Sequence, residues 1–418
     1  MKRRLIIKAN FIFTKEPGNF EIFKDSFLVV KDGRVQAIYS KLPEAYKGHD
    51  VQDYVNKMVI PGFVDLHLHA AQYLQCGIGM TKTLLDWLND YTFDLECKFQ
   101  DPEFATKVYS DFAAKLVAHG TLRAAMFASS STKGTEALFE VLKEQGIGAY
   151  VGKVNMDRNA PGFILEDTAD SVEGTRYLIE KYGDDPLVKP IITPRFAPTS
   201  TDALLKSLGE LAVLGNIPVQ SHLNENMDEM DWVKSLFPKA RHYSDVYDQY
   251  GLFGQTPTIM AHAIYSNDEE VALALKNKVF FCHCPDSNIN VRSGIMPLKR
   301  YLKLGLNLGL GSDIAGGHSI GMNDTIVRAI QLSKLRSMEV KEDEHLTVSE
   351  AFYLATKGGG RFFGKTGSFE PGYWFDALVL EDSPFITELY NLEDRLEKFI
   401  YTGDDRNISA RFVQGRKL

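Results

Sequence analysis

The sequence predicts an α/β fold, a closed (β/α)8 barrel of the TIM type with a small β-sandwich domain built from both ends of the chain. Two patterns carry this prediction. Short apolar strand candidates alternate with helical segments through the middle of the chain, whereas strand candidates alone fill the first sixty and the last fifty residues. A chain of 418 residues is long enough for a large barrel and a second, smaller domain.

Eight strand candidates in the middle of the chain account for the barrel. Helical segments such as 101–120 and 201–216 separate them, with apolar residues at helical spacing. One of these segments opens with Asp101 directly before Pro102, a typical helix start. Eight strand–helix units favour a closed parallel barrel. The strand candidates span 58–69, 121–129, 148–157, 188–196, 217–225, 256–265, 278–286 and 306–317.

A doubly wound open sheet is the structural alternative, and one glycine-rich stretch, LGLGSDIAGG, bears on it. Gly309 and Gly311 begin a G-x-G-x-x-G dinucleotide fingerprint, but Ile314 stands where that motif requires Gly or Ala. We therefore expect a barrel at 61–365, with the sandwich formed by 1–60 and 366–418.

Composition narrows the class of ligand and the compartment. Asp and Glu number 55 against 47 Lys and Arg, a formal net charge of -8, which argues against a nucleic-acid partner and favours a small molecule. Four cysteines are too few for a disulfide framework. No apolar stretch has the length of a signal core or a membrane span. The sequence predicts a cytoplasmic protein with no membrane partner.

Histidines and a carboxylate recur at the ends of the strand candidates, where barrel active sites lie. The first strand ends with two histidines one residue apart, and alternation places His67 and His69 on one face, opposite Val64, Leu66 and Leu68. Imidazole and carboxylate groups at one mouth suit zinc, or iron of similar coordination. The strand-end residues are His67, His69, His222, His262, His283 and Asp313.

Each of these residues also has a purely structural interpretation. A lone His222 or His262 is more often a hydrogen-bonded core histidine, and Asp313 is a possible helix N-cap. Cys282 and Cys284 flank the seventh-strand histidine, and alternation places both on the opposite face, so packing is favoured over metal binding. The coincidence of so many strand ends nevertheless favours a metal site.

Glu225 follows His222 by three residues, where the chain leaves its strand. A metal lowers the pKa of bound water towards about 7, and a nearby free carboxylate can carry protons between water and substrate. Alone, Glu225 resembles a solvated charge at the start of an acidic segment. Beside a strand-end histidine it favours catalysis.

Three side chains near other strand ends can recognise a planar polar ring. Gln72 offers a donor and an acceptor, Arg195 can donate two hydrogen bonds to a carbonyl, and Phe196 can stack on a ring. The alternative for Arg195 is a surface ion pair, and the alternative for Phe196 is a purely structural role in the core. Two longer segments, 80–100 and 227–254, are expected to cover the mouth.

The motifs PGFVDLHLH, QSHLNEN, MAHAIY, HCPDSN and GLGSDIAGG together resemble the amidohydrolase superfamily, in its mononuclear-metal deaminase branch. HLHAAQY, DWLNDYTFDLE, VGKVNMD, ITPRF and YTGDDRNI are similar to the members of that branch that act on guanine. The likeness extends over nearly the whole chain. It implies a homodimeric hydrolase that converts guanine and water to xanthine and ammonia, with one divalent metal per chain.

The resemblance also implies roles for single residues. His67, His69, His222 and Asp313 would bind the metal, and His262 would either complete the coordination or orient the bound water. Glu225 would be the proton shuttle, and Asp313 would accept a proton from the attacking water. The implied substrate contacts are Gln72, Arg195, Phe196, His222, Glu225 and Asp313.

Three other functions compete with this interpretation. One is a deaminase or chlorohydrolase of the same branch that acts on another purine, a pyrimidine or a triazine. A binuclear cyclic-amide hydrolase commonly needs a lysine at the end of the fourth strand, but Lys189 lies at the wrong end and Lys153 on the third strand. A catalytically inactive scaffold is the third, and it should have lost part of the ligand set.

Overall fold

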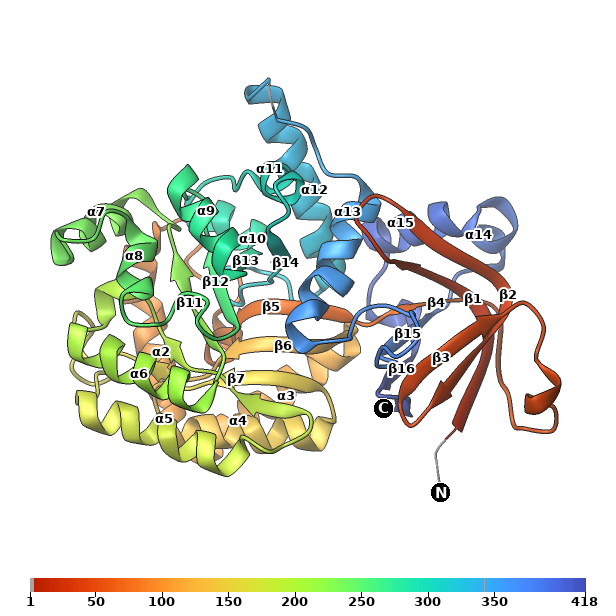
Figure 1. Ribbon diagram of the computed structural model, residues 1–418, viewed down its shortest axis with the longest axis horizontal. Coiled ribbons are helices and arrows are strands. Elements are labelled where there is room, and N and C mark those ends of the chain that lie inside the picture. Colours follow the sequence, from red (N-terminus) through yellow and green to blue (C-terminus); the bar gives the residue numbers. More distant parts are fainter. Residues whose placement is uncertain (1–3, 342) are drawn as a thin grey trace.

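The fold has two parts, a barrel and a β-domain that lies at one side of it (Figure 1). The computed structural model describes residues 4–341 and 343–418. The strands of the β-domain come from both ends of the chain, drawn in red and blue, whereas the barrel takes the sequence between them. The expected barrel with a small β-domain built from both termini is confirmed, and the strands of that domain, expected as a sandwich, pair into one sheet.

The β-domain is one continuous sheet of seven strands that covers its own apolar core. The N-terminal strands β1, β2 and β3 pair with each other, and β4 joins them to the C-terminal strand β15. Phe11, Phe13 and Phe369 pack edge-on at the centre of this core. The strands are β1 (Arg4–Thr14), β2 (Phe20–Lys31), β3 (Arg34–Tyr39), β4 (Gln52–Pro61), β15 (Ala377–Leu380), β16 (Ile408–Val413) and β17 (Arg416–Lys417).

The barrel strands lie at the eight predicted positions and run parallel. The third and fourth are each split in two, and the fourth contains Pro190 and Pro194, which cannot donate to a ladder. The strands are β5 (Phe63–His69), β6 (Thr121–Phe127), β7 (Gly148–Gly152), β8 (Val154–Asn155), β9 (Val188–Pro190), β10 (Thr193–Pro194), β11 (Val219–Leu223), β12 (Thr258–His262), β13 (Phe280–His283) and β14 (Asn307–Leu310).

Backbone hydrogen bonds join the separately paired groups of barrel strands into a closed ring. The Gln220 N–H donates to Ile192 O at 2.9 Å, which links the fourth and fifth strands. On the other side, the Asp313 N–H donates to His67 O and the His69 N–H donates to Ile314 O, each at 2.8 Å. The second seam joins two segments that carry strand-end residues, so closing the barrel also brings those residues together.

Helices surround the barrel and bury their apolar faces against the outer side of its strands (Figure 1). Asp101 caps α3, as the sequence suggests, by accepting from the Glu103 N–H, and Asn267 caps α9 within a capping box. The outer helices are α3 (Pro102–Ala118), α4 (Thr132–Gln145), α5 (Thr168–Tyr182), α6 (Asp202–Gly215), α9 (Asp268–Asn277), α11 (Leu298–Lys303), α12 (Met322–Glu339) and α13 (Val348–Tyr353).

Shorter helices lie in the loops and beside the β-domain. Four consecutive short helices follow the first barrel strand in the segment 84–100. These helices are η1 (Glu44–Tyr46), η2 (Ala70–Gln75), α1 (Leu84–Trp87), η3 (Leu88–Thr92), α2 (Phe93–Cys97), η4 (Lys98–Gln100), η5 (Ala197–Thr199), α7 (Met227–Leu236), α8 (Tyr243–Asp248), α10 (Pro285–Asn290), η6 (Leu354–Gly358), η7 (Arg361–Phe363), α14 (Pro384–Leu389), α15 (Leu392–Thr402) and η8 (Asp405–Asn407).

Strict alternation fails in the first barrel strand, and one prediction about its faces is wrong. The pairing of β5 with β6 shifts register between Asp65 and Leu68. Val64 and Leu66 belong to an inner cluster with Ala125 of β6, whereas Leu68 packs in the outer core. An irregularity of this kind redirects side chains, so Leu66 does not share a face with Leu68.

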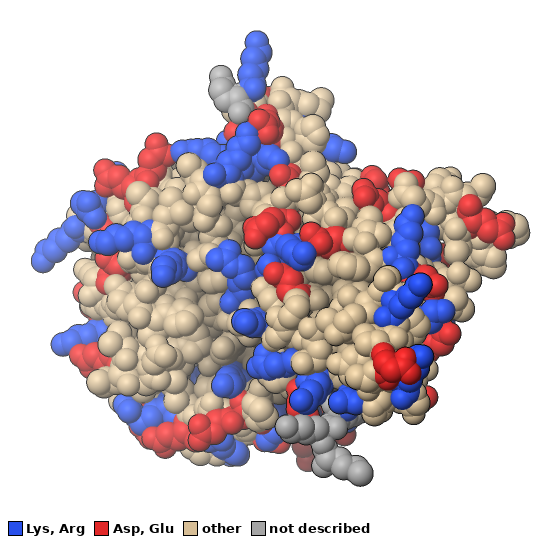
Figure 2. All heavy atoms as spheres, turned by 45° about the vertical axis from the view of Figure 1, so that its right-hand side comes forward, with Lys and Arg blue, Asp and Glu red and all other residues tan. Residues whose placement is uncertain are grey.

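The surface carries charges of both signs. On the face shown in Figure 2, Lys and Arg side chains are interspersed with Asp and Glu. No helix among residues 4–341 and 343–418 combines the length and the apolarity that a membrane crossing requires.

Candidate active site

Five of the expected strand-end side chains meet in one buried cluster at the mouth of the barrel. His69 Nε2 lies 3.1 Å from His222 Nε2. Asp313 Oδ1 lies 3.2 Å from His67 Nε2 and 3.6 Å from His69 Nε2. Asp313 Oδ2 lies 3.7 Å from His262 Nε2. All five residues are at most 8% exposed, so the cluster is shielded from bulk water.

Unusual backbone turns direct these side chains into the mouth. His262 has φ 71° and Asp313 has φ 48°, both in the left-handed region that few residues other than glycine adopt. Asn224, two residues after His222, has φ 48° as well. Strained conformations of this kind cluster at functional sites, where the surrounding structure holds them in place.

Hydrogen bonds orient two of the imidazoles. His222 Nδ1 lies 2.5 Å from Arg195 O, and His262 Nδ1 lies 2.9 Å from Asn288 Oδ1. Because a carbonyl oxygen can only accept, we assign the ring proton to Nδ1 in both residues. Nε2 then carries no proton and can bind a metal in the cluster, the arrangement that metal-binding histidines commonly adopt.

The protonation states of His69, His222 and Asp313 suit metal binding, whereas burial opposes protonation of His262 but Glu225 and Asp313 raise its pKa. Burial, together with the neighbouring imidazoles, holds the pKa of His69 and of His222 well below the ordinary value. Burial opposes ionisation of Asp313, but the adjacent His67 and His262 lower its pKa well below the usual range. Neutral imidazoles beside an ionised carboxylate are the forms that coordinate a cation.

The donor set fits a divalent cation. Ligand atoms of His67, His69 and His222 lie within 4.8 Å of one another, and so do those of His67, His262, Cys284 and Asp313. The buried nitrogens of His67 and Nε2 of His262 make no hydrogen bond to any described residue. Buried polar atoms without partners are costly, and a bound cation would satisfy them.

Glu225 lies beside this cluster without belonging to the donor set. Its Oε2 lies 3.4 Å from His262 Nε2, and its Oε1 accepts a hydrogen bond from Ser293 Oγ at 3.0 Å. Burial raises the pKa of Glu225 to about 7. A carboxyl group with such a pKa can both take up and release a proton near neutral pH.

A small cavity of about 30 Å³ opens directly above the cluster. The expected substrate-contacting residues come together in its lining, which includes Gln72, Arg195, Phe196, His69, His222, His262, Glu225 and Asp313. Arg195 and Phe196 are 3% and 5% exposed. Arg195 is therefore not in a surface ion pair, and Phe196 faces the cavity instead of serving only as a core residue.

The two expected covering segments behave differently. Leu84, Trp87 and Leu88 of the first segment line the cavity, so this segment forms one of its walls. Residues 227–254 contribute nothing to that lining. Trp232 of α7 instead packs edge-on against Phe196, with ring centroids 6.1 Å apart.

The structure reveals polar partners that sequence reasoning missed. Glu96 bonds to both Gln72 and Arg195, Ser293 bonds to Glu225, and Asn288 bonds to His262. Asn288 lies within the HCPDSN motif, but nothing in its spacing indicates which histidine it contacts. Glu96 follows Phe93 at helical spacing, a weak signal that both face the same neighbour.

The seventh strand contributes through its cysteines rather than through its histidine. Cys282 and Cys284 pack in the inner apolar cluster with their Sγ atoms 4.0 Å apart, which agrees with the packing role favoured from sequence. Cys284 Sγ also approaches the donor atoms, a position that the sequence did not predict. Within the described residues, His283 joins neither potential metal group. Lys153 is buried and pairs with Glu166.

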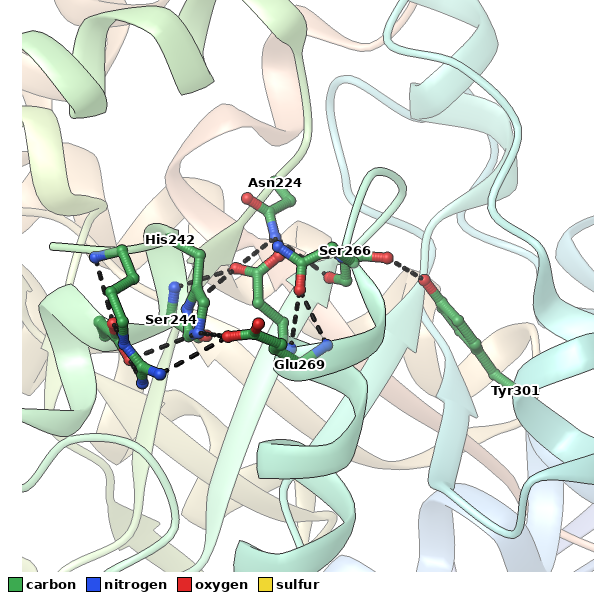
Figure 3. Close-up of polar contacts among 10 residues, drawn as sticks. Asn224, His242, Ser244, Ser266, Glu269 and Tyr301 are labelled. Carbon is green, nitrogen blue, oxygen red and sulfur yellow. Dashed lines mark hydrogen bonds and ion pairs between the residues drawn. The ribbon is translucent and has the colours of Figure 1, made fainter.

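A polar network behind the mouth fixes the turn that carries Glu225 (Figure 3). Asn224 Nδ2 donates to Ser266 Oγ at 3.1 Å and to both carboxylate oxygens of Glu270 at 3.0 Å. Glu270, which is 1% exposed, also accepts the N–H groups of Asn267 and Ser244. One buried carboxylate thus ties the loop after β11 to the starts of α8 and α9.

Comparisons with known proteins identify the family of this chain. The family model described as "Amidohydrolase family" matches residues 58–418. The guanine deaminase of Dictyostelium discoideum is 37% identical, over 99% of this chain and 98% of its own, and that of Escherichia coli is 34% identical, over 94% and 91%. A crystal structure of guanine deaminase from C. acetobutylicum with bound guanine has 51% identity and TM-score 0.98, over 100% of both chains. This chain therefore belongs to the amidohydrolase family.

Proposed function

We propose that this chain catalyses the hydrolytic deamination of guanine to xanthine and ammonia. The observation that carries the proposal is the convergence of His67, His69, His222 and Asp313 beside Glu225, at the base of a cavity that Arg195 lines. The likeness to guanine deaminases over nearly the whole chain identifies the substrate.

Members of the amidohydrolase family use a divalent metal. His67, His69, His222 and Asp313 would hold it, with His262 as a further ligand or as the group that orients the attacking water. Three or more imidazoles with a carboxylate favour zinc. When bound, the metal supplies an acidified water molecule at neutral pH and polarises the bond under attack.

Gln72, Arg195 and Phe196 hold the purine. Guanine is planar and neutral, so Phe196 covers one of its faces, while Arg195 donates to its carbonyl oxygen and Gln72 bonds to its polar edge. The apolar wall of Leu84 and Trp87 shields the ring from water. These contacts orient C2 of the ring towards the catalytic groups.

Glu225 and Asp313 move the protons. Asp313, ionised beside its histidines, accepts a proton from the water that adds to C2. Glu225 delivers a proton to a ring nitrogen and then helps to protonate the exocyclic amine, which leaves as ammonia. The C–O bond that forms and the C–N bond that breaks turn guanine and water into xanthine and ammonia.

We further propose a cytoplasmic homodimer with domains at 1–60, 61–365 and 366–418. Cys76, Cys97, Cys282 and Cys284 are all free thiols, as in proteins of reducing compartments. The likeness to the deaminase branch supports the dimer, and light scattering on the purified protein would test it.

A substrate panel tests the proposed reaction. The purified protein, with its metal content measured, is mixed with guanine, and the ultraviolet spectrum is followed for conversion to xanthine. Adenine, cytosine and a chlorotriazine serve as competing substrates, with release of ammonia or chloride as the readout. Turnover of guanine above all others supports the proposal, whereas preferred turnover of another substrate would reassign the enzyme within its branch.

A further inference from the structure

A buried carboxylate joins two of the side chains that face the cavity. It comes from the segment 80–100, which forms one wall of the cavity and is called the wall segment below. Glu96 of α2 is 1% exposed. Its Oε1 accepts a hydrogen bond from Gln72 Nε2 at 2.7 Å, and its Oε2 pairs with Arg195 Nη1 at 2.7 Å. We propose that Glu96 is a positioning residue that fixes Gln72 and Arg195 as one unit for recognition of a neutral purine. This inference rests on the proposed function.

The two oxygens of Glu96 determine how its partners present themselves to a ligand. Gln72 has its amide nitrogen on Glu96 and its amide oxygen 3.3 Å from the Ala315 N–H, so the orientation of the amide is set at both ends. Each partner keeps further hydrogen-bonding capacity for a ligand. Gln72 is 24 residues from Glu96 in the sequence, and Arg195 is 99 residues from it. Only the folded barrel therefore brings the three side chains into contact.

The helical turn that carries Glu96 holds Arg195 from a second side. The Arg195 guanidinium lies over the ring of Phe93, 5.3 Å from its centroid. Phe93 and Glu96 are three residues apart and therefore lie on the same face of α2. An aromatic face and a carboxylate together leave the guanidinium little freedom, and preorganised donors bind a ligand without further ordering cost.

The pair also sets the charge of the recognition site. A buried arginine without a counter-ion would attract anions, whereas the Arg195–Glu96 pair has no net charge. Guanine is neutral at physiological pH, and its deamination product xanthine is the more acidic purine. Glu96 should therefore weaken binding of anionic purines, the product among them, relative to guanine.

Two substitutions separate positioning from packing. In Glu96→Gln the size is kept, but an amide has one acceptor oxygen for two donors, so one contact is lost together with the charge. In Glu96→Asp the charge and both acceptors are kept while the side chain is one methylene shorter. Positioning predicts that Glu96→Asp retains more activity than Glu96→Gln. Simple filling of space predicts the reverse order, which would overturn the inference.

Steady-state kinetics of the holoenzyme with guanine measure the effect of these substitutions. Glu96→Gln should lower kcat/KM about tenfold or more, chiefly through KM, because it removes charge-assisted bonds that hold the substrate-binding groups. The ratio of the xanthine inhibition constant to KM for guanine should fall. Asp94→Asn, which removes an exposed carboxylate from the same helix, is the matched control and should behave as wild type.

A double-mutant cycle keeps the test valid if one variant is less stable. Gln72→Ala and Glu96→Gln combined should cost less than the product of their separate effects, because both disrupt one unit. Circular dichroism and metal content establish that each variant is folded and loaded. Independent, multiplicative effects would refute the proposal. A wild-type protein that does not deaminate guanine would instead refute the proposed function, so the two failures are distinguishable.

Discussion

Replacing Glu225 by glutamine tests the assignment of the proton shuttle. The substitution keeps the size of the side chain, and the new amide oxygen can still accept from Ser293, which now lies 3.0 Å from the carboxylate. The amide nitrogen can face His262 Nε2, now 3.4 Å from the other oxygen. We therefore expect the fold, the metal and guanine binding to survive while proton transfer is lost.

The structure sets the size of the expected effect. General acid–base catalysis contributes about 10²–10⁴-fold, and Glu225 acts on both the ring nitrogen and the leaving amine, which places it near the upper limit. A loss of roughly 10⁴-fold in kcat corresponds to about 5.5 kcal/mol of transition-state stabilisation. Its two neighbours cannot take over this role, because the Ser293 hydroxyl bonds to Glu225 itself and His262 Nδ1 already bonds to Asn288.

Stopped-flow absorbance measures the single-turnover rate of Glu225→Gln, and calorimetry measures its affinity for guanine. Asp228→Asn is the matched control, because Asp228 is an exposed carboxylate on the neighbouring helix α7. The expected result is a slow enzyme with normal metal content and near-normal guanine affinity. A turnover rate within about tenfold of wild type would refute the shuttle role.

Three other side chains give predictions about substrate binding, loop order and fold stability. Phe196→Ala should raise KM for guanine about tenfold with a smaller change in kcat, because base–aromatic stacking contributes about 1–3 kcal/mol; an unchanged KM in steady-state assays would exclude the stacking role. Glu270→Gln places an amide nitrogen among backbone and side-chain donors and should lower the free energy of unfolding in urea by about 1–3 kcal/mol, whereas the exposed Glu269→Gln should not. Asp376→Ala leaves the buried Arg123 without its 2.7 Å partner and should cost about 3–5 kcal/mol in the same experiment. Activity per folded molecule should be unchanged in the Asp376 variant, and a loss of activity without a loss of stability would contradict this account.

The sequence alone was sufficient to predict the architecture and the set of residues that converge at the mouth. Alternating strands and helices predict a parallel barrel, and the carboxyl ends of parallel strands share one face. His67, His222 and Asp313 could therefore be placed together although they are far apart in the chain. That inference needs only the order of elements, which local patterns record.

Contacts that depend on register or on distant loops could not be predicted in this way. The irregular pairing at Asp65–Leu68 arises from how β5 meets β6, so alternation within β5 alone gave the wrong face for Leu66. Glu96 reaches Arg195 only because the wall segment folds back over the mouth. Cys284 approaches the donor atoms because the inner face of β13 ends beside them. Each of these features is tertiary, and no local pattern encodes it.

Metal stoichiometry measured together with activity tests the central claim most directly. The two potential metal groups share His67, and the resemblance to the mononuclear branch implies a single cation, so elemental analysis should find one divalent metal per active chain. Chelation should abolish guanine turnover and lower the melting temperature, because a cation that binds only the folded state stabilises it. Adding back one equivalent of zinc should restore both. Full activity in a metal-free protein, or two metals per chain, would contradict the account.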